Sequence, residues 1–273
     1  MTLKSGYLGV GLVNRTVVRA SMIRVDSIYK SFPLAKAAAK KTGQRTLSAV
    51  KGVSLHCARG EVLALLGSNG AGKTTTLRLL STALSVDSGE IWIDDVPVHR
   101  FPRRARKNIG FLSQSTPLYR RLTVYENLMF FGQLYQLPAP ALIQRIETLA
   151  DQLSFGAYLH QKVDSLSTGM QQKASIARSI LHDPDLLVLD EPTSGLDVAA
   201  AQQILEFVLQ QRSQGKAIVF STHHMHEVEL LADRLCVIDQ GRTCFTGTLQ
   251  AAKQGTQQDN LSQAFLALIA EAS

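Results

Sequence analysis

A glycine-rich loop with one lysine is the clearest chemical signal in the chain. Residues 67–74 have the sequence Gly-Ser-Asn-Gly-Ala-Gly-Lys-Thr, which matches the pattern G-x-x-x-x-G-K-[ST]. Glycines let the backbone turn tightly enough to point consecutive N–H groups at phosphate oxygens, and a following helix adds partial positive charge at its start. Lys73 would then reach the β- and γ-phosphates of a nucleotide, and the Thr74 hydroxyl would hold Mg²⁺. The residues predicted to contact the nucleotide here are Gly67, Ser68, Asn69, Gly70, Ala71, Gly72, Lys73, Thr74 and Thr75.

Two adjacent carboxylates supply a second signal. Four apolar residues at 186–189 predict a buried strand, and Asp190 and Glu191 follow at its carboxyl end, where open α/β sheets bind their ligands. Asp190 is expected to contact Mg²⁺ through water, and Glu191 is expected to polarise an attacking water. A carboxylate pair at the end of a strand is a weak signal alone. Together with the lysine loop it indicates nucleotide hydrolysis.

The elements that would position these residues alternate between strands and helices. Such alternation is typical of a mostly parallel sheet that is covered on both faces. Gln240-Gly241 predicts a turn and a terminal hairpin. Between about 115 and 170 the pattern is helical, with a capping box from Thr123 to Glu126, and predicts an inserted subdomain. Strands are predicted at 23–28, 61–66, 90–94, 186–189, 217–221 and 234–238, and helices at 72–84, 123–134, 139–153, 169–181, 199–212 and 226–233.

Composition and charge narrow the class of protein. The chain has 273 residues, of which 45% are hydrophobic and only 19% are charged, which excludes a disordered, collagen-like or coiled-coil chain. We expect no membrane-spanning helix, because no apolar stretch is long enough. Cys57, Cys236 and Cys244 are irregularly spaced, so we expect no disulfide or zinc site and a reducing compartment. A formal charge of +7 predicts an anionic partner, which is a nucleotide, a nucleic acid or a lipid surface.

A third motif makes the sequence resemble a known family. Residues 166–172, Leu-Ser-Thr-Gly-Met-Gln-Gln, precede the carboxylate strand and resemble the signature motif Leu-Ser-Gly-Gly-Gln of ATP-binding-cassette (ABC) ATPases. Phe32 lies at the position of the aromatic that stacks on adenine, Gln114 at that of the Q-loop and His223 at that of the switch histidine. Residues 194–197, Ser-Gly-Leu-Asp, are similar to the D-loop. The resemblance covers about residues 22–250.

The resemblance implies a fold and an assembly. The fold is α/β: a P-loop NTPase, specifically an ABC-type nucleotide-binding domain with a RecA-like parallel-sheet core, a small antiparallel β region and the helical subdomain. In this family Ser167 and Gly169, at a capped helix start, bind the γ-phosphate held by a second copy, so a homodimer sandwiches two ATP molecules. Taken alone, Ser167 is better interpreted as an ordinary N-cap with no ligand, and its spacing of 23 residues to Asp190 favours the phosphate site instead. Gln114 and His223 join Glu191 as catalytic residues, and Gln114 joins Thr74 and Asp190 around Mg²⁺.

Closer features narrow the choice within the family. The runs 108–114, 118–127 and 220–229 resemble bacterial sodium-efflux (Nat-type) ATPase subunits. Those subunits pair with a separate integral-membrane permease at the cytoplasmic face of the inner membrane. The same subgroup includes exporters of drugs, polysaccharides and lipids, so the cargo rests on analogy. A non-transport ABC ATPase acting on ribosomes or DNA is the competing class, and a small-molecule kinase would leave the signature and switch histidine unexplained.

Several segments have more than one interpretation. We predict a loosely ordered N-terminal extension over 1–21, the ABC ATPase domain over 22–250 and a helical tail over 251–273. The Ala- and Lys-rich segment 33–46 predicts an exposed insertion or a short basic helix. His223, His224 and His226 suggest a metal cluster, but they would not share one helix face. The basic run 103–107 lacks interleaved aromatics, so we interpret it as a solvated face and expect no nucleic-acid partner.

Overall fold

The central sheet of the protein is mostly parallel. The computed structural model describes residues 21–34, 43, 45–113 and 116–272 of the chain. Six strands pair in the order β10–β9–β3–β8–β7–β6, and only the pair β9–β10 is antiparallel. The predicted parallel sheet and terminal hairpin are therefore confirmed. The strands are β3 (Val62–Leu66), β6 (Ile109–Leu112), β7 (Leu186–Asp190), β8 (Ala217–Ser221), β9 (Arg234–Asp239) and β10 (Arg242–Thr248).

The apolar runs of the sheet exist because both of its faces are buried. All five residues of β7 are buried, and the four apolar ones alternate between two hydrophobic cores. Leu187 and Leu189 pack into the core shared with α6 and α7, whereas Leu186 and Val188 pack into the core shared with α2 and the antiparallel sheet. A strand buried on both faces cannot show polar alternation, which explains why the sequence reads as a continuous run.

A second, four-stranded sheet has the order β2–β1–β4–β5 and is antiparallel. β1 extends to Pro33, which pairs with Thr46 at the start of β2, so the predicted strand at 23–28 was too short. Register shifts between Val25 and Ile28 interrupt the alternation and hide this length. The strands are β1 (Ser21–Pro33), β2 (Thr46–Ala58), β4 (Ser88–Ile93) and β5 (Val96–Pro97). Of the extension predicted over 1–21, only Ser21 is described, and it is the first residue of β1; most of the segment 33–46 also lies outside the described residues.

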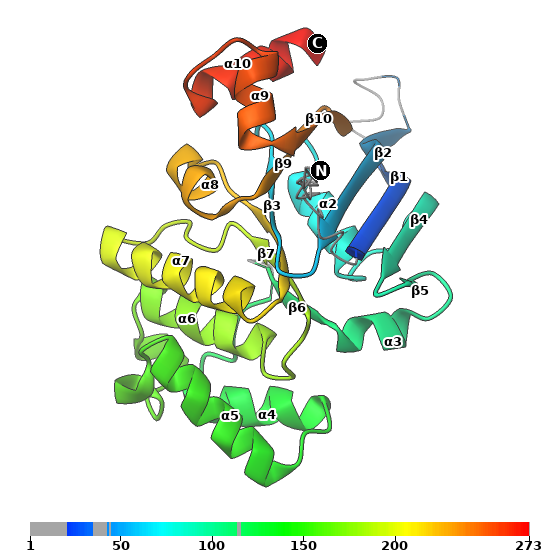
Figure 1. Cartoon of the computed structure of the whole chain (residues 1–273). Coiled ribbons are helices and arrows are strands. Elements are labelled where there is room, and N and C mark those ends of the chain that lie inside the picture. The colour runs from blue at the N-terminus through cyan, green and yellow to red at the C-terminus, as the bar shows by residue number, and fades with distance from the viewer. Residues whose placement is uncertain (1–20, 35–42, 44, 114–115, 273) are drawn as a thin grey trace, which may run out of the picture.

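Helices surround these sheets (Figure 1). Helix α2 ends at Leu80 and not at residue 84 as predicted, because Thr82 adopts a left-handed conformation with φ 62°. Helices α4 and α5 lie at the bottom of Figure 1, and α9 and α10 lie at the top. The helices are α2 (Lys73–Leu80), α3 (Pro102–Lys107), α4 (Val124–Leu134), α5 (Ala139–Gln152), α6 (Thr168–Ser179), α7 (Val198–Ser213), α8 (Met225–Leu231), α9 (Leu249–Gly255) and α10 (Leu261–Ala272). No helix among the described residues is long and apolar enough to cross a membrane.

Candidate nucleotide-binding site

Three neighbouring strands bring the predicted site residues to one edge of the central sheet. β8 lies between β3 and β7, and its last residue, Ser221, pairs with Leu65 on one side and with Asp190 on the other. The glycine-rich loop therefore follows β3 at the same height at which Asp190 ends β7. His223 follows two residues after Ser221. The sheet register alone thus gathers the lysine loop, the carboxylate pair and the switch histidine.

The glycine-rich loop wraps around the Lys73 side chain. Lys73 Nζ donates to the Gly67 and Ser68 carbonyls at 2.8 and 3.1 Å. Burial lowers the pKa of Lys73, and the charges of Glu191 and Asp190 oppose that shift. Gly72 has φ 105°, and a Cβ there would lie 2.5 Å from the Ala49 carbonyl oxygen of β2, so only glycine fits. Helix α2 starts directly after Gly72 with no side-chain cap, which leaves its first N–H groups for an anion.

The other residues of the loop also lie where the sequence predicts. Ser68 donates from Oγ to Asp239 Oδ1 at 3.3 Å, which ties the loop to the end of β9. The Ala71 carbonyl accepts a hydrogen bond from the Gly241 N–H at 2.9 Å. Asn69 and Gly70 are exposed, and Thr75 is half-buried in the first turn of α2. The loop is therefore fixed at both of its sides while its crest faces solvent.

The Asp190 carboxylate is held by two hydroxyl groups. Ser221 Oγ donates to Asp190 Oδ1 at 2.8 Å, and Thr74 Oγ1 donates to the same oxygen at 3.3 Å. Asp190 is buried, whereas Thr74 is exposed at the start of α2. A carboxylate oxygen and a hydroxyl oxygen this close together are ligands of the kind that Mg²⁺ prefers. The predicted pair Thr74 and Asp190 is thus brought together.

Glu191 is placed by its backbone in a strained conformation. Its φ is 47°, in the left-handed region that side-chain-bearing residues rarely adopt. The Glu191 N–H donates to both the carbonyl and the hydroxyl oxygen of Ser221, at 3.2 and 3.0 Å. His223 Nδ1 lies 3.6 Å from Glu191 Oε1. The geometry therefore places a histidine beside the carboxylate predicted to polarise water.

A buried carboxylate that the sequence analysis missed connects the loops that carry Glu191 and His223. Glu227, at the start of α8, is 1% exposed and accepts hydrogen bonds from Thr193 Oγ1 at 2.5 Å and Thr222 Oγ1 at 2.6 Å. Thr193 follows Glu191 by two residues, and Thr222 precedes His223. We call Glu227, Thr193 and Thr222 the threonine clamp. Its signal in the sequence is weak, because a Glu in the first turn of a helix is ordinary.

The signature residues lie at the N-terminus of α6. Ser167 Oγ accepts from the Met170 N–H at 3.3 Å and is exposed. The N-cap predicted from the sequence is therefore present. A Cβ on Gly169 would lie 3.2 Å from Ala200 Cβ, so this helix start packs closely against α7. Among the residues that the structure describes, no hydrogen bond joins Ser167 to Lys73, Asp190 or Glu191.

The structure says less about two of the residues predicted to bind the nucleotide, Phe32 and Gln114. Phe32 is half-buried and pairs with Leu47 of β2, two residues before Ala49, whose carbonyl touches Gly72. It therefore lies on the strand pair that borders the lysine loop. Gln114 lies outside the described residues. The three histidines do not form a metal cluster, because no group of three His, Cys, Asp or Glu side chains in the described ranges could hold a metal ion.

A small cavity lies beside the loop and includes a residue of the C-terminal helix. Its volume is about 230 Å³, and its lining includes Asn69, His223, Met225 of α8 and Phe265 of α10. Helix α10 lies within the helical tail predicted over 251–273, and its Phe265 packs against the main core. The structure also places it at the nucleotide end of the sheet.

The fold and the site define a P-loop nucleotide hydrolase, and comparisons with known proteins identify its family. Residues 50–194, more than half of the chain, match the family model described as "ABC transporter". The chain belongs to the ABC transporter family, as the ordered motifs predicted, and it is an ATPase.

Individual relatives agree with that assignment. The chain is 38% identical over 224 residues to the ABC transporter ATP-binding protein NatA of Bacillus subtilis, which covers 82% of this chain and 91% of that protein. It is 39% identical to the Nod factor export ATP-binding protein I of Paraburkholderia xenovorans, over 84% of this chain and 71% of that protein. A solved structure described as the ATP binding subunit of an ABC transporter superposes with a TM-score of 0.78, at 27% identity, over 91% of this chain and 99% of that chain.

Proposed function

We propose that this chain is the ATP-hydrolysing subunit of an ABC exporter, that it drives a separate integral-membrane permease, and that it lies at the cytoplasmic face of the inner membrane. The observation that carries the proposal is the register of β3, β8 and β7, which gathers the phosphate loop, Asp190, Glu191 and His223 at one edge. Similarity to a Nod factor export protein supports export as the direction of transport. Sodium is the cargo that the resemblance favours, and a drug, polysaccharide or lipid is the alternative.

The donor set at Asp190 fits Mg²⁺. Thr74 and Asp190 would hold the ion with Gln114, and bound Mg²⁺ would neutralise charge on the β- and γ-phosphates. The chain's own residues have distinct tasks. Lys73 and the free N–H groups of α2 bind the phosphates, Glu191 holds and polarises the attacking water, and His223 orients Glu191 from 3.6 Å. Phe32, at the edge of the strand pair, stacks on the adenine.

The position of Ser167 supports an ATP-sandwich homodimer. Its capped helix start is exposed and has no hydrogen bond to the phosphate-loop cluster in the described part of the chain. A helix N-terminus that can bind phosphate but makes no hydrogen bond to the site of its own chain is available to the site of a second copy. Ser167 and Gly169 would then complete the nucleotide site of the partner.

A groove lined with aromatic residues supports the permease as a partner. The groove has a volume of about 570 Å³ and lies between α3, β6 and α4. Tyr119 stacks on Phe131 at 5.9 Å, and the Arg178 guanidinium lies 5.1 Å from the Phe131 ring. The rim of the groove is apolar and exposed, a combination that marks protein–protein contact sites. We call this the docking groove, and its exposed rim consists of Tyr119 (51%) and Tyr135 (43%), with the exposed ring of Phe130 (40%) packed edge-on against Tyr119 at 5.3 Å.

Membrane co-purification with a matched pair of variants tests this function. The tagged chain is expressed with the multi-span membrane protein encoded beside it, and the complex is extracted in mild detergent. Tyr119→Glu puts a charge on the rim of the docking groove, where the tyrosine is 51% exposed, whereas Leu266→Glu puts the same charge on α10, where the leucine is 64% exposed. We expect the first variant to lose the permease and the second to retain it, with unchanged ATP hydrolysis by both isolated chains. Equal retention by the two variants would contradict docking at the groove, and failure of the unmodified chain to capture a membrane protein would contradict the function.

A further inference from the structure

The basic excess of the chain is concentrated in one segment. The sequence contains 29 Lys and Arg and 22 Asp and Glu. Seven of the 29 basic residues and none of the 22 acidic residues lie between positions 96 and 125. The rest of the chain therefore has 22 basic and 22 acidic residues. An anionic partner of the whole protein is therefore expected at this segment and not over the surface in general.

The structure exposes most of this charge on α3 and on the turn before it. Arg103 and Lys107 are one helical turn apart and therefore share a face. Ala105 is buried and anchors the helix, while the cations around it are exposed. Phe101, the N-cap residue, lies between Arg100 and Arg103 in the sequence and is 53% exposed. We call Arg100, Phe101, Arg103, Arg104, Arg106 and Lys107 the α3 patch.

Other arginines in the described part of the chain form ion pairs with carboxylates, unlike the cations of the α3 patch. Arg59, Arg145 and Arg212 each form an ion pair with an aspartate. Within the ranges that the structure describes, no ion pair joins a cation of the α3 patch to a carboxylate. Unpaired exposed cations attract anions from solution at little desolvation cost.

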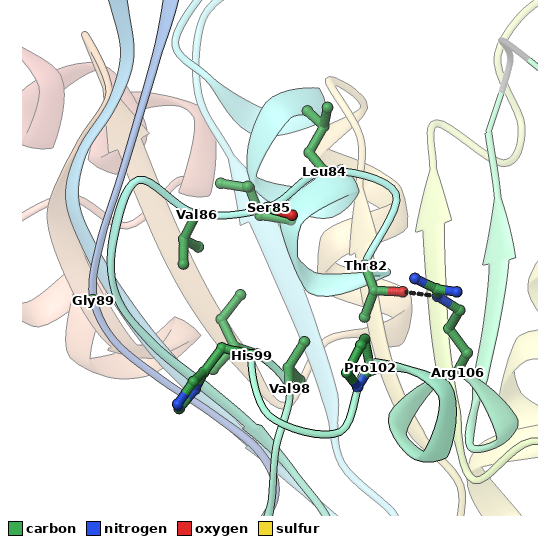
Figure 2. A pocket seen from close by; sticks show the side chains of 11 residues that line it. Thr82, Leu84, Ser85, Val86, Gly89, Val98, His99, Pro102 and Arg106 are labelled. Atoms are coloured by element: carbon green, nitrogen blue, oxygen red, sulfur yellow. Dashed lines mark hydrogen bonds between the residues drawn. The ribbon is translucent and has the colours of Figure 1, made fainter.

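Hydrogen bonds hold the segment that carries the α3 patch against β4 and the end of α2, and Figure 2 draws one of them, between Arg106 and Thr82. A cavity of about 280 Å³ separates α3 from the end of α2, and Val98 and Pro102 line it from the α3 side. Arg106 closes one side of this cavity, where its Nε donates to Thr82 Oγ1 at 2.8 Å. The Val98 N–H donates to the Ile91 carbonyl of β4 at 2.9 Å, and the Phe101 N–H donates to the Pro97 carbonyl at 3.0 Å. The side chains of Arg103 and Arg104 form none of these hydrogen bonds, so both residues can be substituted without breaking them.

The α3 patch borders the docking groove. Arg106 lines both the cavity of Figure 2 and the groove, whose lining also includes Phe131 of α4 and Tyr135, the C-cap residue of that helix. A membrane protein that docks in the groove would therefore bring the α3 patch close to the surface of its own bilayer. A negatively charged leaflet attracts basic segments within about 10 Å, the screening length at 0.1 M salt.

We propose that the α3 patch binds anionic phospholipid headgroups of the membrane in which the permease lies, with Phe101 inserted at the interface between headgroups and acyl chains. The orientation of the patch rests on the proposed function, whereas its affinity for anionic lipid is a property of this chain alone. Lipid is favoured over nucleic acid because the patch offers a single exposed aromatic ring and no series of rings on which bases could stack. Lipid contact would add a second attachment to the membrane and orient the subunit under its permease.

Vesicle co-sedimentation of the full chain tests the proposal. Vesicles of phosphatidylcholine with about one third phosphatidylglycerol are compared with phosphatidylcholine alone, at low and high salt. The chain should bind only the anionic vesicles, and salt should release it. The variant Arg103→Gln/Arg104→Gln should bind about 30-fold more weakly, since each basic residue near an anionic surface contributes about a factor of five. The matched control, Arg242→Gln/Lys253→Gln, removes the same charge from β10 and α9 at the other end of Figure 1 and should bind like the unmodified chain.

Three outcomes would overturn the proposal. The unmodified chain could fail to bind anionic vesicles, or the two double variants could lose binding equally, which would mean a general effect of net charge. Patch-dependent binding to a labelled duplex that is tighter than binding to vesicles would assign the patch to nucleic acid. These results are separable from the proposed function, because capture of the permease through the docking groove is measured in detergent. Vesicle binding without permease capture would contradict the function, and the reverse result would contradict only the lipid site.

Discussion

Ser221 Oγ donates a hydrogen bond to Asp190 Oδ1 at 2.8 Å and accepts one from the Glu191 N–H at 3.0 Å. One buried hydroxyl therefore fixes both the carboxylate predicted to face Mg²⁺ and the backbone of the residue predicted to polarise water. Ser221 is fully buried at the end of β8, where the register places it directly opposite Asp190. It acts through its neighbours, so it is a positioning residue and not a catalytic one.

Removal of this hydroxyl should slow hydrolysis more than it weakens the fold. In Ser221→Ala, Asp190 and the Glu191 N–H each lose a partner, so we expect ATP turnover to fall about tenfold and the free energy of unfolding to fall by about 1 kcal/mol. Ser179→Ala is the control, because it removes a buried hydroxyl whose one hydrogen bond in the described part of the chain is to the Ile176 carbonyl of its own helix. Steady-state phosphate release and urea unfolding measure the two effects. Equal turnover in the two variants would contradict the positioning role.

The threonine clamp should couple the two catalytic loops. Glu227→Ala leaves the Thr193 and Thr222 hydroxyls without their acceptor, so we expect a loss of about 1–3 kcal/mol in unfolding free energy and a lower kcat with little change in ATP affinity. Glu229→Ala is the matched control on the same helix, since Glu229 is exposed and its one ion pair within the described residues is with Lys253. Calorimetric ATP binding and phosphate release separate affinity from turnover. A folded Glu227→Ala variant with unchanged kcat would show that the clamp is purely structural.

Substitution of Glu191 tests its predicted role with water. Glu191→Gln keeps the shape of the side chain but cannot accept a proton, so hydrolysis should be about 100-fold slower or more while ATP still binds. Equilibrium binding and single-turnover phosphate release are the measurements. Turnover close to that of the unmodified chain would assign the water-polarising role to another residue.

The sequence located the ends of the strands that carry the site, but it did not show that those strands are neighbours. Lys73, Asp190 and His223 were each found from a local pattern: a loop motif, a strand end and a motif order. That β8 lies between β3 and β7 depends on contacts between residues far apart in the chain, and no local pattern records them. Ser221 and Glu227 were missed for this reason, because each has a role only through partners on other strands or loops.

The elements missed elsewhere have local causes of a different kind. The alternation of β1 is broken by register shifts near Ile28, so the strand looked half as long as it is, and β2 was not recognised. Helix α2 looked longer because apolar residues continue past Leu80, whereas the left-handed Thr82 ends it. In both cases one backbone conformation overrides the pattern of side chains.

Dimer formation in ATP tests whether the signature residues serve the nucleotide site of a second copy. Glu191→Gln should form a dimer in ATP, because it binds ATP without hydrolysing it and removes a negative charge from the interface. Adding Ser167→Arg places a bulky cation at the exposed start of α6 and removes the N-cap oxygen that accepts from the Met170 N–H, so the dimer should be lost while each chain still binds ATP. Adding Ser262→Arg, near the start of α10, is the control for an exposed serine and should leave the dimer intact. Light scattering with and without ATP measures assembly. An ATP-dependent dimer that persists in Glu191→Gln/Ser167→Arg would mean that the start of α6 lies outside the interface, and the ATP-sandwich arrangement would be wrong for this protein.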